Sequence, residues 1–110
     1  AWPARRIAVS ARSCATISTE FKADPKLEHL LGWEALWALT QGIEKAQSLD
    51  SAAVASALET METIETPFGP GNMQGAATYG ANRVLVRPAA LATLMNGEAK
   101  HMGWVTPVLP

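Results

Sequence analysis

Apolar side chains recur close to the 3.6-residue period of a helix over residues 32–46, and the charged and amide side chains fall on the other side. This amphipathic pattern predicts a helix. The organised part of the chain is expected to begin at Asp24-Pro25, where Asp24 suits a helix cap and Pro25 a first helical turn. The apolar positions of the pattern are Trp33, Leu36, Trp37, Leu39 and Ile43.

A second helix is predicted over residues 51–61. The polar pair Gln47-Ser48 interrupts the first pattern, and Asp50 or Ser51 then provides a helix cap. One face of this helix carries Val54, Ala57, Leu58 and Met61. Two amphipathic helices joined by a short polar loop are expected to pack against a flat surface.

Proline and glycine dominate the stretch ETPFGPGNM, residues 65–73. Ile64 alternates with polar neighbours before Pro67, which lacks a ladder donor and so belongs at a strand edge or in a turn. The following Gly69-Pro70-Gly71 predicts a rigid reversal between extended segments. A nucleotide-binding glycine loop is disfavoured because a proline lies inside the stretch and no helical pattern follows at once.

The C-terminal third contains an ambiguity. Val84, Leu85 and Val86 predict a strand, whereas residues 88–95 combine helix-forming alanines and leucines with a proline at a suitable first position. Asn96-Gly97 is the strongest two-residue signal for a hairpin between residues 91–95 and 100–105. Local propensity therefore favours a helix where the turn favours two strands.

Residues 1–22 differ from the rest and are taken as a poorly specified basic tail. They contain Arg5, Arg6 and Arg12, and residues 1–19 include no acidic side chain, as in a targeting leader. The apolar core of a secretory signal is missing, because polar residues interrupt it. An edge strand over residues 6–9 is the alternative. We therefore divide the chain into this tail, residues 1–22, and a second unit, residues 23–110.

Composition excludes several classes of protein. The chain has 110 residues and a formal net charge of −1, which favours neither nucleic acid nor an anionic membrane as a partner. Its single cysteine, Cys14, cannot form an internal disulfide, and we interpret it as an inert thiol. No apolar run approaches the length of a membrane helix.

Catalysis is not expected. The two histidines, His29 and His101, lack the His-Glu-x-x-His spacing of a zinc site, and no thiol other than Cys14 is present. The carboxylate pairs Glu59/Glu62 and Glu62/Glu65 are expected to stay solvated. We therefore expect no enzyme activity, metal or cofactor.

The order of four sequence segments resembles the order found in a known protein family. The segments GWEALWALTQGIEKAQS, DSAAVASALETME, IETPFGPGNM and LATLMNGEAKHMGWVTPVLP together resemble the C-terminal part of the branched-chain amino acid type of periplasmic solute-binding protein, the receptor of an ABC importer. The similarity covers residues 21–110. It implies a mixed α and β fold, α/β in class, in which two amphipathic helices precede a turn and a C-terminal β-hairpin. It also implies that residues 91–95 are a strand, against their helix propensity.

In such receptors two lobes close over a small ligand, and the resemblance implies that this segment completes one lobe and the hinge. Most ligand contacts of the family come from parts that have no counterpart here. Only the approach to the first helix resembles a stretch that lines the cleft, so His29 and Trp33 are the candidate ligand-binding residues. The competing interpretations are a core position for Trp33 and a solvated or helix-capping position for His29.

Two functional hypotheses follow. In the first, the chain is part of a periplasmic receptor, truncated or proteolysed, that delivers branched-chain amino acids or related small amides and carboxylates to an ABC permease. In the second, it is a free-standing dimeric interaction module without solute binding. Either way we expect the isolated chain to form a homo-oligomer, because the faces carrying Leu36, Trp37 and Ile43 need cover.

Overall fold

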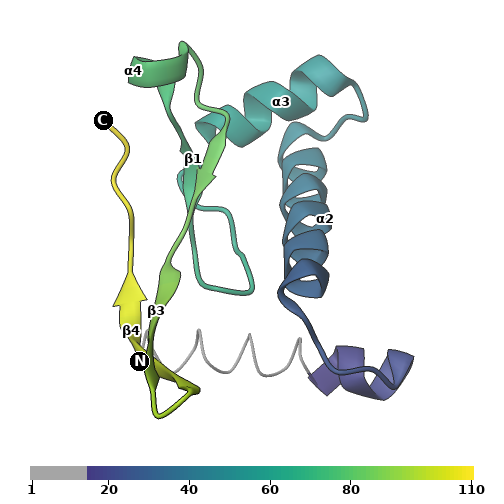
Figure 1. The fold of residues 1–110 in the computed structure, drawn as a ribbon. Coiled ribbons are helices and arrows are strands. Elements are labelled where there is room, and N and C mark those ends of the chain that lie inside the picture. The colour runs from purple at the N-terminus through teal and green to yellow at the C-terminus, as the bar shows by residue number, and fades with distance from the viewer. Residues whose placement is uncertain (1–14) are drawn as a thin grey trace.

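The computed structural model describes residues 15–110 and confirms a mixed α and β fold (Figure 1). Predictions for the edge strand at residues 6–9 and for Cys14 lie outside the described residues. A helical segment at residues 15–21 precedes the labelled elements and buries Ile17. The labelled helices are α2 (Leu27–Ala46), α3 (Ser51–Thr60) and α4 (Ala76–Tyr79), and the strands are β1 (Asn72–Gln74), β2 (Val84–Val86), β3 (Ala89–Met95) and β4 (Glu98–Val105).

Helix α2 ends as predicted but begins between the two predicted positions, after Asp24-Pro25 and before residue 32. Its last residue is Ala46, and Gln47 terminates it in the left-handed region with a φ of 51°. Its first residue is Leu27, so Asp24 is not the cap and Pro25 is not in the first turn. The apolar period of residues 33–43 located the packed part of the helix, whereas residues 27–31 are helical through favourable local propensity while remaining largely exposed.

Helix α3 agrees closely with the prediction of a helix over residues 51–61. The Asp50 carboxylate accepts a hydrogen bond from the Ala53 N–H at 3.0 Å, which confirms the predicted cap. Helices α2 and α3 pack directly against each other. The contact is close at Gly42, where a Cβ atom would stand 2.7 Å from Cγ of Leu58. A small residue at this point therefore sets the separation of the two helices.

The proline-glycine stretch forms the predicted reversal. Ile64 and Gly71 exchange two backbone hydrogen bonds, and Thr66 and Gly69 exchange two more inside them. The Thr66 hydroxyl also donates to the Gly69 carbonyl at 2.5 Å. Ile64, Thr66 and Pro67 are the largest fully buried side chains of the described residues. The turn is thus part of the core rather than a surface loop.

Gln41 joins α2 to this turn. Its amide nitrogen donates to the Glu65 carbonyl at 2.9 Å, and its amide oxygen accepts from the Glu65 N–H at 2.8 Å. One side chain therefore satisfies both backbone groups of Glu65, as a neighbouring strand would do.

Replacing Gln41 with methionine keeps the side chain at nearly constant length and removes both hydrogen bonds to Glu65, together with the local one from the Gln41 amide nitrogen to the Trp37 carbonyl. We expect a loss of about 2 kcal/mol of unfolding free energy, because two partly buried backbone groups lose their partners. Urea denaturation followed by circular dichroism measures the change. Gln47→Met is the control, since the exposed Gln47 makes one local hydrogen bond within the end of α2. Equal effects of the two substitutions would contradict the role given to Gln41.

Two separate antiparallel pairs complete the fold. Strands β1 and β2 pair with Met73 opposite Leu85, and β3 and β4 form a hairpin that turns at Asn96-Gly97. Both turn residues have positive φ, 53° and 80°, as the predicted two-residue loop requires. The hairpin confirms strands over the region that has helix propensity. A register shift between Leu91 and Ala92 marks a bulge in it.

Candidate functional site

The two predicted ligand-binding residues lie together near the N-terminal end of α2. His29 and Trp33 are four residues apart, so their side chains emerge on the same side of the helix, one turn from each other. His29 is exposed, and its Nδ1 accepts a hydrogen bond from the Lys26 N–H at 3.1 Å. Trp33 is 37% exposed and is not a core residue. His29 therefore acts as a helix cap, and Trp33 retains an accessible ring surface.

This hydrogen bond defines the chemistry of the imidazole. A neutral histidine that accepts through Nδ1 carries its proton on Nε2. His29 therefore keeps Nε2–H as its one ring donor, one helical turn from Trp33. A donor next to an apolar ring suits a small molecule with an anionic or carbonyl oxygen at one end and an apolar group at the other.

Replacing His29 tests its role as a cap. His29→Ala removes the acceptor for the Lys26 amide, so we expect faster hydrogen exchange in the first turn of α2 and a loss of about 1 kcal/mol or less. His29→Glu is the matched variant, because a carboxylate three residues after the cap position makes the same bond. It should restore slow exchange. Unchanged exchange in His29→Ala would contradict the capping role.

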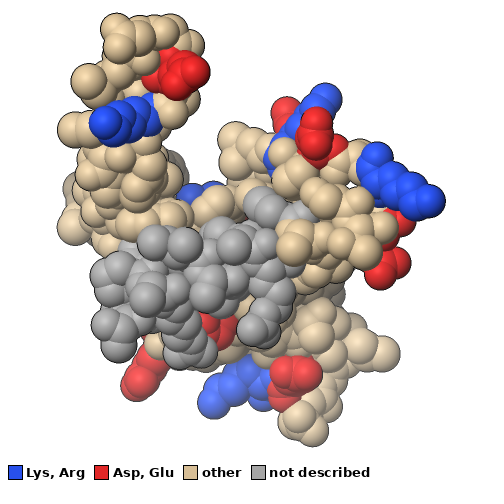
Figure 2. Space-filling model, turned by 90° about the horizontal axis from the view of Figure 1, so that it is seen from below, with Lys and Arg blue, Asp and Glu red and all other residues tan. Residues whose placement is uncertain are grey.

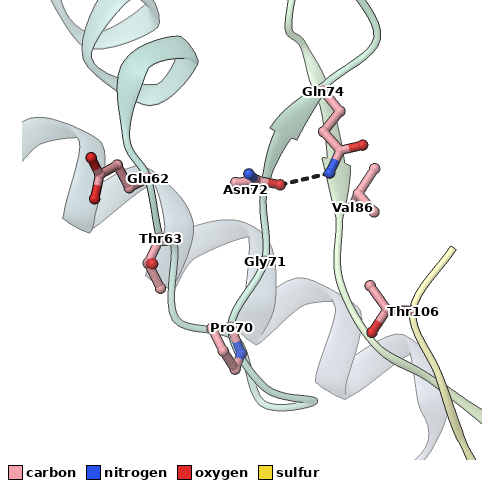
Figure 3. A pocket seen from close by; sticks show the side chains of 8 residues that line it. All are labelled: Glu62, Thr63, Pro70, Gly71, Asn72, Gln74, Val86 and Thr106. Carbon is pink, nitrogen blue, oxygen red and sulfur yellow. Dashed lines mark hydrogen bonds between the residues drawn. The ribbon is translucent and has the colours of Figure 1, made fainter. Parts of the chain in front are cut away.

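A shallow pocket of about 210 Å³ lies elsewhere, beside the turn (Figure 3). Neither His29 nor Trp33 lines it. Polar groups dominate its walls, and the Gln74 amide nitrogen donates to the Asn72 side-chain oxygen at 2.9 Å. The lining residues are Glu62, Thr63, Pro70, Gly71, Asn72, Gln74, Val86 and Thr106.

Sequence reasoning did not single out this pocket. Pro70 and Gly71 were recognised as turn residues, but Thr106 reaches the pocket only because the chain after β4 returns beside β1 and β2. The polar residues Asn72 and Gln74, which alternate with Met73 directly after the turn, were the available local signal.

Three of the groups considered for catalysis lie in separate parts of the described chain. Glu59 forms an ion pair with Arg83 at 2.7 Å. His101 lies on β4 against Trp104, with the ring centroids 5.6 Å apart, whereas His29 begins α2. Among residues 15–110 no three potential ligands from His, Cys, Asp and Glu gather where they could hold a metal ion.

Charges of both signs lie on the face shown in Figure 2. On the face shown in Figure 2, lysines and arginines alternate with acidic side chains, and the described residues form no extended patch of one sign there. A mixed surface of this kind does not concentrate a polyanion electrostatically.

Comparison with known proteins identifies the class. A family model described as periplasmic binding protein matches residues 10–99, which is well over half of the 110-residue chain. The chain therefore belongs to the periplasmic binding protein family, and the resemblance stated from the sequence is confirmed. A search of curated proteins and a search of solved structures each found no significant match.

Family membership supports a general role in solute binding for transport, and members are generally binding proteins rather than enzymes. The match begins at residue 10, so the helical segment at 15–21 lies inside it, while the division after residue 22 stays a prediction. No helix in the described part of the chain has the length and apolar character needed to cross a membrane.

Proposed function

We propose that the chain is part of the periplasmic receptor of an ABC importer and that the solute is a branched-chain amino acid or a related small amide or carboxylate. The observation that carries this proposal is the family match over residues 10–99. The receptor would deliver its solute to an ABC permease. Residues 1–110 would complete one lobe and the hinge of a longer protein.

The surface at the start of α2 supports this solute class. The Nε2–H of His29 would donate to the solute carboxylate or amide oxygen, and Trp33 would cover its aliphatic side chain. The positive end of the helix dipole lies at the same end of α2 and favours a carboxylate there. Groups outside this segment would bind the α-amino group.

The proposal is tested on the complete reading frame. The genomic DNA upstream of the codon for Ala1 is read first, and the complete polypeptide is then titrated calorimetrically with branched-chain amino acids, amides and aromatic carboxylates. We expect saturable micromolar binding that weakens in Trp33→Ala and in His29→Glu, which keeps the helix cap. His101→Ala, the other histidine, is the control. If neither α2 substitution changes the affinity for the solute, His29 and Trp33 are not part of the binding site. If no solute binds at all, the receptor proposal is contradicted.

A free-standing dimeric interaction module is the second candidate. The observation that favours it is the number of large apolar side chains exposed on α2 and on the hairpin, such as Leu36 at 68% and Leu94 at 76%. Exposed apolar surface of this kind marks an interaction site. A reading frame that starts at or near Ala1, with a defined dimer in analytical sedimentation, would support this candidate. A longer frame whose product is monomeric would support the receptor.

A further inference from the structure

The hairpin of β3 and β4 stands apart from the labelled helices and from the β1–β2 pair. Its strands pack on each other, but neither packs on α2, α3, β1, α4 or β2 (Figure 1). Side chains on both of its faces are exposed, including Leu91, Leu94 and Met102. The hairpin connects to the rest of the described chain after β4, where Thr106 lines the pocket beside the turn and the Pro110 carbonyl accepts a hydrogen bond from Thr78. It also connects where the chain leaves β2 and enters β3, at Arg87-Pro88.

Three contacts hold Arg87 at this junction. Its Nε donates to Oε2 of Glu34 on α2 at 2.7 Å, and its guanidinium carbon lies 4.1 Å from the ring centroid of Phe68 in the turn. Its Nη1 also donates to the Pro88 carbonyl at 3.3 Å. Pro88 itself is buried and has a restricted φ. One planar side chain thus connects the helix, the turn and the first peptide of the hairpin.

The ion pair between Arg87 and Glu34 is sheltered from water. The side chains of Arg87 and Glu34 are 21% and 12% exposed, whereas those of Arg83 and Glu59, the ion pair at the other end of β2, are 71% and 30% exposed. Screening by solvent weakens an exposed pair far more than a sheltered one. A guanidinium held on one edge by a carboxylate and on one face by an aromatic ring also has little freedom to rotate.

We propose that Glu34, Arg87 and Phe68 form a joint that sets the direction of the β3–β4 hairpin relative to α2 and α3. The joint holds the backbone at residues 87–88 in one conformation. Without it the exit from β2 loses the side-chain contacts that fix it, so the hairpin takes up a wider range of directions. Arg87 is a positioning residue, and this inference does not depend on the identity of the solute.

The test measures the direction of the hairpin. Spin labels are attached to cysteines at the exposed positions Ser56 on α3 and Glu98 at the hairpin end, in the full 110-residue chain with Cys14→Ser. We expect one narrow distance distribution by double electron–electron resonance. Arg87→Gln should lose the narrow maximum while circular dichroism shows that the helices persist. The matched control Arg83→Gln removes the exposed pair and should retain it. An unchanged distribution in a folded Arg87→Gln would overturn the proposal.

A second variant decides the matter if Arg87→Gln fails to fold. Reversing the charges with Glu34→Arg and Arg87→Glu together rebuilds an ion pair between the same two elements, whereas each reversal alone places two like charges together. We expect the double variant to fold and to recover a narrow distribution. A broad distribution in the folded double variant, or a double variant no better folded than either single reversal, would count against the joint.

Discussion

Residues 1–110 on their own are expected to show no saturable binding of branched-chain amino acids, amides or aromatic carboxylates by calorimetry. His29 and Trp33 lie on an exposed helix surface, so a solute bound there stays open to water. An exposed ion pair contributes at most about 1 kcal/mol, whereas micromolar affinity requires roughly 8 kcal/mol. Binding energy would have to come from groups that enclose the solute from outside this segment.

The opposite result would be equally informative. Micromolar binding to the isolated chain that is lost in His29→Ala or Trp33→Ala, and kept in His101→Ala, would contradict the proposal that this segment only completes a lobe. It would identify a compact binding module instead. Comparing the solute affinity of residues 1–110 with that of the complete polypeptide then shows whether this segment contributes part of a binding site or none of it.

Gly71→Ala is expected to destabilise the fold strongly. A Cβ at this position would overlap the carbonyl oxygen of Val86, and the clash is with backbone rather than with a flexible side chain. Gly71 also exchanges two hydrogen bonds with Ile64, which is fully buried. Relieving the clash must separate the turn from β2, so we expect a loss of about 3 kcal/mol or more in urea denaturation.

Gly32→Ala is the matched control. Gly32 lies inside α2, and a Cβ there would have nothing within 4 Å. Alanine in the interior of a helix is favoured over glycine by about 1 kcal/mol, so this substitution should stabilise the chain. If both glycine substitutions shifted the urea midpoint in the same direction, the close contact of Gly71 with β2 could not be the cause.

Local signals predicted those elements whose cause is local. The Asp50 cap and the end of α2 before Gln47-Ser48 each depend on residues a few positions apart, and both are confirmed. The hairpin at Asn96-Gly97 is confirmed as well, but the local signals there conflicted and the family resemblance favoured the strands. The apolar period, which starts at residue 32, placed the start of α2 too late, whereas the Asp24-Pro25 signal placed it too early. The apolar period reports where a helix packs, whereas its N-terminal end was decided by the cap between Lys26 and His29.

The candidate site was predictable only in part. The sequence led to His29 and Trp33 through a family resemblance, and the structure places them on one side of the same helix. The pocket beside the turn was missed, because it joins the turn to Thr106, which is remote along the chain. No local pattern reports such an approach.

The sequence by itself determined the class of fold, the two helices, the rigid turn and the hairpin, because caps, apolar periods and turn residues act over a few positions. Only the tertiary structure decided which side chains hold these elements together. Gln41 meets Glu65 across 24 positions, and Arg87 meets Glu34 across 53. Each of these contacts depends on where two elements come to lie in space, because an amide or a charged side chain can pair with many different groups. From the sequence alone, Gln41, Glu34 and Arg87 are therefore expected only to be polar surface residues. The packing of the elements makes them the links between α2, the turn and the hairpin.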